Sequence, residues 1–455
     1  MKKMNILRFN FYKKNLQNFT SRVKFTSEFK TKINFVFTDP KDFEKENDSV
    51  SDFKKNFPLN FNEIKNGEKT IIDRSMYYKS DTEQSDNKFN HKILIIKNNA
   101  NRDILAKSIK EAMNLIMSLN NKSLLLTFSK SIDNIRDRSY IINQIICSNY
   151  IARDVVDGKE LDIDFNFRVP YKREKLNLSN QQSIIQEIRI YYDNFFENNY
   201  NKKKVFESII SGLSKNYSRK LSNLRANVAN CDFMEKEAIN ILNKENLILD
   251  EIIQFNPNSR EKYNSLSLNY EKNNKNKCSV EVVKGKQLLD EKMNLFYNVG
   301  KSAETEPRLI ILKYNGDETS NEYSHCILGK GLTFDTGGIN LKPTGYLEDM
   351  FLDKHGACST LSVFKAIKNL GLKINIICAL AVAENSIDSN SYKPSDIIEG
   401  RNGIRVEVGN TDAEGRLCLA DSLTYLQDKY SPNVIIDIAT LTGACMVALV
   451  RNYFY

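Results

Sequence analysis

Short apolar segments with the length of β-strands alternate along this chain with longer segments that carry one apolar helical face. This pattern predicts an α/β protein, because amphipathic helices bury their apolar faces against the sheet that the strands form. The predicted strands are 31–37, 92–97, 123–129, 280–283, 308–314, 374–383 and 434–438, and the predicted helices are 101–119, 132–156, 182–224, 233–246, 286–296, 355–369 and 415–429. Polar, irregular loops are predicted at 39–90 and 256–277.

The composition fits a folded chain with reduced thiols. Hydrophobic residues make up 41% of the 455 positions, which excludes wholesale disorder and allows a sizeable core. The eight cysteines form no CxxC pair, so a reducing compartment is favoured over a disulfide framework. No run of about 18 or more apolar residues is present, and no membrane-spanning helix is predicted. Only three histidines occur, which argues against a histidine-rich zinc site.

The net charge of +9 is concentrated in one terminal arm. Residues 1–30 carry eight basic residues and one acidic residue, a net +7, so the rest of the chain is close to neutral. The arm has the character of an organelle transit peptide, but a solvated terminus explains its composition equally well. Nucleic-acid binding through this arm is a further hypothesis, and the near-neutral remainder of the chain argues against it.

Two glycine-rich segments near the C-terminus hold the residues with the clearest chemistry. The segment GKGLTFDTGGINLK (329–342) places Lys330, Asp335 and Lys342 among glycines that let the backbone turn tightly. In NTDAEGRL (410–417), Asp412 and Glu414 are two residues apart, so an extended chain directs both carboxylates to one side. Each segment taken alone is also consistent with a charged turn.

Asp353 adds a further carboxylate, although a lone aspartate before a glycine turn is usually a helix cap. Four carboxylates that converge carry a charge of −4 and need compensation, which two divalent cations would supply. Oxygen ligands suit zinc, manganese or magnesium ions, and a lysine next to such ions can itself bind as a neutral amine. The sequence therefore predicts a two-metal site.

These motifs resemble the leucyl aminopeptidase (cytosolic aminopeptidase) family of dinuclear metallopeptidases. The octapeptide NTDAEGRL is intact, and it is highly specific for the family. The resemblance is strong from about residue 280 to 446 and weak before 218. The other matching segments are GKGLTFDTGG at 329–338, LKP at 341–343, ENS at 384–386, YKPSDII at 392–398 and DIATLTGA at 437–444.

The resemblance implies a role for each matching residue. Asp335 and Glu414 would bridge two zinc or manganese ions, and a bridging hydroxide would attack the peptide bond. Lys342 would polarise the scissile carbonyl, and Arg416 would hold a bicarbonate ion that acts as general base. The implied metal ligands are Lys330, Asp335, Asp353, Asp412 and Glu414, and the implied substrate-binding residues are Met350, Asn410, Thr440 and Leu441.

The resemblance also implies the organisation of the whole chain. We expect an α/β protein with a macro-like N-terminal domain at 31–180, a helical linker at 181–217 and a mixed-sheet catalytic domain at 218–455. The implied substrates are short peptides with a Leu-like N-terminal residue, the implied assembly is a homohexamer, and the implied location is the cytoplasm. Organelle targeting by residues 1–30 stays open.

Three departures from the family pattern bear on activity. FDTGG replaces the usual FDSGG, and the sequence Asp353-Lys354-His355-Gly356 places a basic pair beside a predicted ligand, which could shift metal affinity. The chain ends at Tyr455, before further family elements, so we expect a catalytic domain that is incomplete at its C-terminus. An inactive, truncated family member that serves as an oligomer subunit is therefore the alternative function.

Overall fold

The computed structural model describes residues 135–150, 199–243 and 277–448 as continuous segments. Between residues 5 and 192 it also describes short strands and a few helical residues. The chain divides into two compact units. The N-terminal unit comprises 1–151, 166–213 and 246–267, and the C-terminal unit comprises 152–165, 214–245 and 268–455. All predicted site residues lie in the C-terminal unit.

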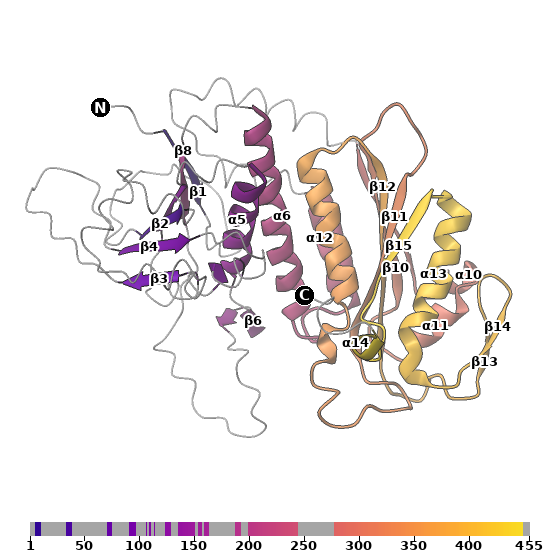
Figure 1. Ribbon diagram of the computed structural model, residues 1–455. Coiled ribbons are helices and arrows are strands. Elements are labelled where there is room, and N and C mark those ends of the chain that lie inside the picture. Colours follow the sequence, from indigo (N-terminus) through magenta and orange to yellow (C-terminus); the bar gives the residue numbers. More distant parts are fainter. Residues whose placement is uncertain are drawn as a thin grey trace, which may run out of the picture. The chain divides into compact units, whose positions relative to one another are not determined.

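A mixed five-stranded sheet forms the centre of the C-terminal unit (Figure 1). The pairs β9–β10 and β10–β12 on one side of the sheet are antiparallel, whereas β12–β11 and β11–β15 on the other side are parallel. The sequence prediction of a mixed-sheet α/β fold for this part of the chain is confirmed. In spatial order the strands are β15 (Val434–Ile438), β11 (His325–Asp335), β12 (Asn375–Asn385), β10 (Arg308–Asn315) and β9 (Cys278–Lys284).

The central strand β12 shows why the sheet lies between two layers of helices. Successive side chains on a strand point to opposite faces, and nearly every residue of β12 is buried. Ala379, Ala381 and Ala383 belong to the core on one face, and Cys378 and Leu380 belong to the core on the other. A continuous apolar segment of this kind is stable only where both faces of the sheet are covered.

Different helices cover the two faces of this sheet. Residues of α12 (His355–Leu370), α7 (Cys231–Asn243) and the end of α6 (Asn199–Asn223) form one core with the sheet. Residues of α10 (Lys286–Asp290), α11 (Asn294–Gly300) and α13 (Glu414–Tyr430) form the other. Figure 1 shows α12 on one side of the strands and α13 with α11 on the opposite side.

Two buried lysines, one directly before α12 and one within it, hold the ends of the neighbouring helices. The Lys354 ammonium donates to the carbonyl oxygens of Ser222 (3.2 Å) and Leu224 (2.7 Å) at the end of α6, and also to that of Phe351. The Lys368 ammonium donates to the carbonyl of Ile241 at the end of α7, at 2.6 Å. Cations are favourable at helix C-termini, where carbonyl groups lack partners within the helix.

A mixed six-stranded sheet forms in the N-terminal unit. The helix α5 (Ile135–Ser148) follows one of its strands in the sequence. The pairs β8–β5, β5–β2 and β2–β4 are parallel, and the outer strands pair antiparallel with their neighbours. The order is β1 (Asn5–Asn10), β8 (Glu187–Tyr192), β5 (Ser123–Phe128), β2 (Ile33–Thr38), β4 (His91–Ile96) and β3 (Ile71–Arg74). The predicted strands near 31, 92 and 123 are confirmed.

Two of the helices are shorter in the structure than the sequence predicts. The helix predicted at 132–156 ends at Ser148, and β6 (Arg153–Val156) instead pairs with β7 (Lys159–Asp162). The helix predicted at 182–224 begins at Asn199, and β8 occupies part of its predicted N-terminal half. β8 reads EIRIYY, in which isoleucine and tyrosine favour a strand, and short apolar runs do not distinguish strand from helix.

Other boundaries also differ from the prediction. The helix predicted at 286–296 is two helices, α10 and α11, separated by a turn in which Lys292 has a φ of 58°. β3 lies inside the predicted loop 39–90, and β1 lies inside the basic arm. The predicted loop 256–277 falls almost wholly outside the described residues, as does most of the predicted helix 101–119. None of the described helices is long and apolar enough to cross a bilayer.

Asp421 on α13 fastens this helix to two other segments. Its carboxylate is buried and accepts backbone N–H bonds from Phe296 in α11 (3.1 Å) and from Arg401 (2.9 Å). The Arg401 guanidinium in turn lies 4.9 Å from the ring centre of Tyr425 and pairs with exposed Asp428. The buried carboxylate thus satisfies two backbone donors that otherwise lack partners.

We expect Asp421→Ala to lower the free energy of unfolding by about 2–4 kcal/mol, because both backbone donors lose their acceptor. Urea unfolding measures the change. The matched control is Asp428→Ala on the same helix, where an exposed ion pair contributes at most about 1 kcal/mol. Equal effects of the two substitutions would contradict this account of Asp421.

Glu281 on β9 is the acceptor at the centre of a polar cluster. It accepts hydrogen bonds from Tyr430 (2.8 Å), Tyr425 (3.2 Å) and Lys313 (3.3 Å), and also from Lys429. Burial favours the neutral acid, but the hydrogen bonds from Lys429, Tyr430 and Lys313 outweigh it and lower the pKa of Glu281 to about 2. The ionised form is therefore stabilised in the folded protein.

The stabilisation from Glu281 should depend on pH. It is fully present above the ordinary pKa of 4.5 and is lost as the pH falls towards 2. At pH 7 we expect Glu281→Gln to cost about 1–2 kcal/mol, because ionic hydrogen bonds are lost at a partly exposed site. The difference between wild type and variant in urea unfolding should shrink between pH 5 and pH 3. A difference that stays constant over this range would refute the expectation.

Candidate metal centre

The predicted site residues gather at one end of the central sheet, past the carboxyl ends of its parallel strands. Lys330 and Asp335 belong to β11, and Asp335 is its last residue. Asp353 directly follows the short helix η3 (Met350–Leu352), and Glu414 is the first residue of α13, directly after η4 (Thr411–Ala413). Parallel strands end at the same edge, which is where open α/β sheets place their sites.

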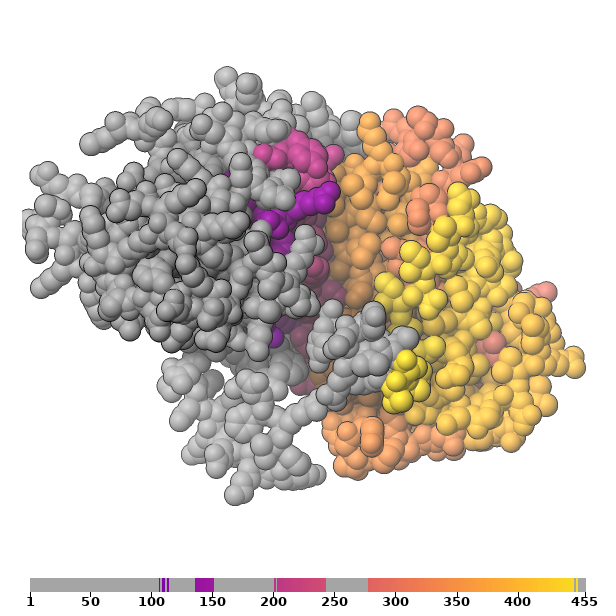
Figure 2. Space-filling view, viewed as in Figure 1, coloured from indigo at the N-terminus to yellow at the C-terminus, as the bar shows by residue number. Residues whose placement is uncertain are grey.

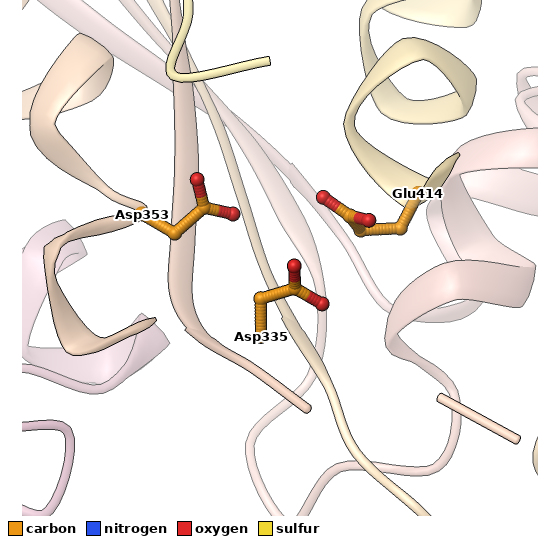
Figure 3. A group of neighbouring side chains, drawn as sticks. All are labelled: Asp335, Asp353 and Glu414. Carbon is orange, nitrogen blue, oxygen red and sulfur yellow. The ribbon is translucent and has the colours of Figure 1, made fainter. Parts of the chain in front are cut away.

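Three carboxylates form the core of the site. Asp335, Asp353 and Glu414 each place one oxygen within 4.8 Å of the others, and all three residues are buried. Figure 3 shows the three side chains pointing toward one another from separate elements. Buried carboxylates this close repel each other strongly unless positive charge lies between them.

Lys330 supplies positive charge inside the cluster. Its side chain is 2% exposed, and its ammonium lies 2.7 Å from Asp353 Oδ2 and 2.8 Å from Glu414 Oε1. The ammonium also donates to the carbonyl oxygen of Thr440 at 3.0 Å. Burial lowers the pKa of Lys330, but Asp353 and Glu414 outweigh burial and raise it. A Cβ at Gly415 would lie 2.5 Å from Lys330 Cε, so a larger residue there would displace the end of the lysine side chain.

Asp353 has one oxygen that is well satisfied and one that is not. Thr440 Oγ1 donates to Asp353 Oδ1 at 2.6 Å. Asp353 Oδ2 is buried, and its ion-pair partner among the described residues is the Lys330 ammonium, 2.7 Å away. Burial raises the pKa of Asp353 to about 7, and the opposing effect of Lys330 is smaller. An incompletely satisfied buried oxygen that faces two other carboxylates is a suitable cation ligand.

Lys342 and Asp412 form the outer part of the site. The Lys342 ammonium lies 3.0 Å from Asp335 Oδ2 and also donates a hydrogen bond to Asp412 Oδ1. The Asp412 side chain is 31% exposed, whereas that of Lys342 is 14% exposed. Burial lowers the pKa of Lys342, but Asp412 and Asp335 outweigh burial and raise it. The second lysine thus connects the buried carboxylates with the more accessible one.

Hydrogen bonds around Thr411 hold the loops that carry these residues. Thr411 is fully buried, and its hydroxyl donates to the carbonyl of Gly337 at 2.7 Å. Asn340 Oδ1 accepts the Thr411 N–H at 2.8 Å, and the Asn340 N–H returns a bond of 2.8 Å to the Thr411 hydroxyl. Tyr392 donates its hydroxyl to the Thr411 carbonyl at 2.7 Å. The loop after β11 is therefore fixed against the segment that carries Asp412.

The other predicted site residues lie around this cluster. Arg416 is exposed on the first turn of α13 and, among the described residues, makes no ion pair with the carboxylates of the site. The Asn410 side chain turns back and accepts the N–H of Asp412 at 2.8 Å. Met350 is half-buried in η3, and Leu441 is 40% exposed after β15. The roles of these four residues in binding bicarbonate or substrate stay predictions.

Sequence reasoning did not assign the supporting polar residues. Asn385, Thr411 and Tyr392 make hydrogen bonds to the cluster or to its loops, and none had been given a role. All three lie within segments that already matched the family motifs, which was the available signal. The structure also explains one residue of the basic pair Lys354-His355, because the Lys354 ammonium binds carbonyl groups at the end of α6.

The comparisons with known proteins identify the family of this chain. The model of the "Cytosol aminopeptidase family, catalytic domain" matches residues 216–454, which is more than half of the chain. The chain belongs to the cytosol aminopeptidase family. Membership confirms the resemblance inferred from the motifs, and it places the chain in a family of metallopeptidases, which are hydrolases.

Relatives of this family member match part of its length. A probable cytosol aminopeptidase of Wigglesworthia glossinidia brevipalpis is 46% identical over 177 residues, which is 39% of this chain and 35% of the relative. One of Pseudomonas fluorescens (strain Pf0-1) is 47% identical over 170 residues, 37% of this chain and 34% of the relative. The chain thus matches about a third of the length of these relatives.

A solved structure shows a similar fold. The leucine aminopeptidase of Caenorhabditis elegans superimposes with a TM-score of 0.61, over 94% of this chain and 74% of the other. The two sequences are 19% identical, so this likeness concerns the fold alone. It agrees with the mixed α/β architecture of the family member.

We expect Lys330→Met to destabilise the metal-free protein by about 3–5 kcal/mol, because it leaves buried Asp353 and Glu414 without their cation. Urea unfolding in excess chelator measures the change. Lys393→Met is the control, since Lys393 is exposed and its ammonium bonds only the Ser391 carbonyl in the described structure. If both variants unfold at the urea concentration of the wild type, Lys330 does not compensate the carboxylates.

Proposed function

We propose that this family member is a metal-dependent aminopeptidase that removes N-terminal residues, preferably Leu-like ones, from short peptides. The observation that carries the proposal is the convergence of Asp335, Asp353 and Glu414 within 4.8 Å in a buried site. Membership in the cytosol aminopeptidase family supports the reaction type. The intact NTDAEGRL motif supports the assignment of the individual residues.

The residues present fit divalent cations. The donor set is rich in carboxylate oxygens, which suits zinc or manganese, and Asp353 Oδ2 is a buried oxygen that faces the cluster beside the Lys330 ammonium. Asp335, Asp353 and Glu414 would hold the ions together with Asp412 and the amine of Lys330. Two bound ions would supply Lewis-acid polarisation of the peptide carbonyl and activation of water.

The chain's own residues would provide the remaining steps. The Lys342 ammonium lies at the accessible side of the cluster, so it can donate a hydrogen bond to a carbonyl oxygen that gains negative charge. Asp412 is the most exposed of the four carboxylates and can attract the free amino group of a peptide. Thr440 holds Asp353 in place through its hydroxyl. Met350, Asn410 and Leu441 would line the substrate position.

Several finer points belong to the same proposal. The Arg416 guanidinium can bind a planar anion such as bicarbonate through two parallel hydrogen bonds, and its exposure leaves it accessible. The family resemblance supports a homohexamer. The relatives' name, cytosol aminopeptidase, supports a cytoplasmic location. A macro-like N-terminal domain at 31–180 also remains part of the proposal.

We expect the protein loaded with manganese or zinc to hydrolyse leucinamide, and we expect Asp412→Ala and Glu414→Gln each to reduce kcat/KM at least about a hundredfold. At metal sites, loss of a residue that only supports a ligand reduces metal affinity or activity about 10–100-fold, and loss of a ligand itself should reduce them further. Ammonia release measures the rate. Asp428→Ala, which removes an exposed carboxylate of α13 remote from the site, should retain wild-type activity.

Metal analysis separates the competing outcomes. Wild-type activity in Asp412→Ala would refute the role of that carboxylate in hydrolysis. A protein that binds two ions but hydrolyses no peptide amide would favour the alternative of an inactive oligomer subunit. A protein that binds no metal would refute the proposal as a whole.

A further inference from the structure

Asn385 lies beside the carboxylates without belonging to them. It is the last residue of β12, and it pairs in register with Asp335 at the end of β11. Its side chain is fully buried, and its amide nitrogen donates to Asp335 Oδ1 at 2.8 Å and to the Thr411 carbonyl at 3.1 Å. Both partners are acceptors, so the nitrogen of the amide must face them.

These bonds distinguish the two oxygens of Asp335. Asp335 Oδ1 also accepts the backbone N–H of Gly337 at 2.9 Å, so two donors occupy this oxygen. Asp335 Oδ2 instead faces the cluster, where the Lys342 ammonium lies 3.0 Å away. The carboxylate is therefore held in one rotational state, in which Oδ2 has neither of these two bonds and faces the Lys342 ammonium.

The second bond from Asn385 reaches the segment that carries the other carboxylates. Thr411 immediately precedes Asp412 and is three residues before Glu414, and its carbonyl accepts from both Asn385 and Tyr392. One buried amide thus joins the end of β11 to the start of η4. This connection contributes to the relative position of Asp335 and Glu414, together with the bonds from Thr411 to Gly337 and Asn340.

The amide of Asn385 is not fully satisfied. Its Oδ1 is buried and, within the described residues, accepts no hydrogen bond. A buried acceptor without a donor is unfavourable for stability. The presence of asparagine at this position is therefore better explained by the two bonds of its nitrogen, to Asp335 and Thr411, than by a gain in folding stability.

We propose that Asn385 is a positioning residue of the metal centre, which makes Asp335 a ligand through Oδ2 alone. This inference rests on the proposed function, since it requires that Asp335 bind metal. Asn385 itself does not touch the ion or the substrate. It fixes the orientation of one ligand and the distance between the two segments that carry Asp335 and Asp412.

The test compares Asn385→Leu with Asn375→Leu in the full chain. Leucine has nearly the shape of asparagine but no donor. Asp335 Oδ1 keeps its bond from Gly337, and the Thr411 carbonyl keeps its bond from Tyr392. Asn375 is a buried asparagine at the opposite end of β12, about 33 Å away at 3.3 Å per residue. It bonds Ser320 and Asp317 and no predicted ligand.

We expect Asn385→Leu to weaken Mn²⁺ binding about 10–100-fold in competition with a chelating indicator, as is usual when the partner of a ligand is lost. Asn375→Leu should bind Mn²⁺ like wild type even if it unfolds at lower temperature. Equal Mn²⁺ affinity of wild type and Asn385→Leu would overturn the inference and leave the proposed function intact. Failure of the wild type to bind Mn²⁺ would instead refute the proposed function.

A crystal structure of the wild-type protein with Mn²⁺ provides an independent measurement, which decides the question if Asn385→Leu does not fold. We expect Asp335 Oδ2 at coordination distance from Mn²⁺, with Asp335 Oδ1 still bonded to Asn385 and Gly337. A manganese ion bound to Asp335 Oδ1 would overturn the inference.

Discussion

The ammonium of Lys330, buried between Asp353 and Glu414, allows the acidic cluster to exist inside the folded chain. Three carboxylates within 4.8 Å would otherwise repel one another in a region that water does not screen. Much of the surrounding structure follows from this requirement. Gly415 leaves room for the lysine side chain, and the Thr440 carbonyl accepts a further hydrogen bond from its ammonium.

The fold meets this requirement by bringing several chain segments to one edge of a rigid sheet. β11, β12 and β15 run parallel, so Asp335, Asn385 and the residues after Ile438 emerge at the same edge. Both faces of the sheet are covered, and α12 and α13 begin at that edge with their first turns beside the site. Lys354 directly before α12, Lys368 within α12 and Asp421 of α13 attach these helices to their neighbours.

Polar residues next to the proposed ligands fix the orientation of two of the carboxylates. Thr440 fixes one oxygen of Asp353, and Asn385 with Gly337 fixes one oxygen of Asp335. Each carboxylate is thereby left with a defined oxygen toward the centre. This arrangement gives a physical reason for the motifs of the cytosol aminopeptidase family. Motif residues that would bind no ion, such as Asn385 and Thr440, hold the carboxylates that would bind one.

The sequence alone determined the alternation of strands and helices in the C-terminal unit and the identity of the acidic and basic residues of the site. Those inferences succeed because burial on both faces leaves a local apolar pattern, and because NTDAEGRL and GKGLTFDTGG are short motifs read directly from the chain. The pattern failed at 182–224, where the short run of β8 looks the same in a helix or a strand.

Only the tertiary structure decided how those residues meet. The contacts between Lys330 and Glu414, Thr440 and Asp353, and Asn385 and Asp335 join residues 50 to 87 positions apart, and sequence spacing carries no information about such distances. Which oxygen of Asp335 faces the centre depends on two donors from different segments. The direction of the Lys354 side chain, away from the carboxylates, likewise depends on where α6 ends.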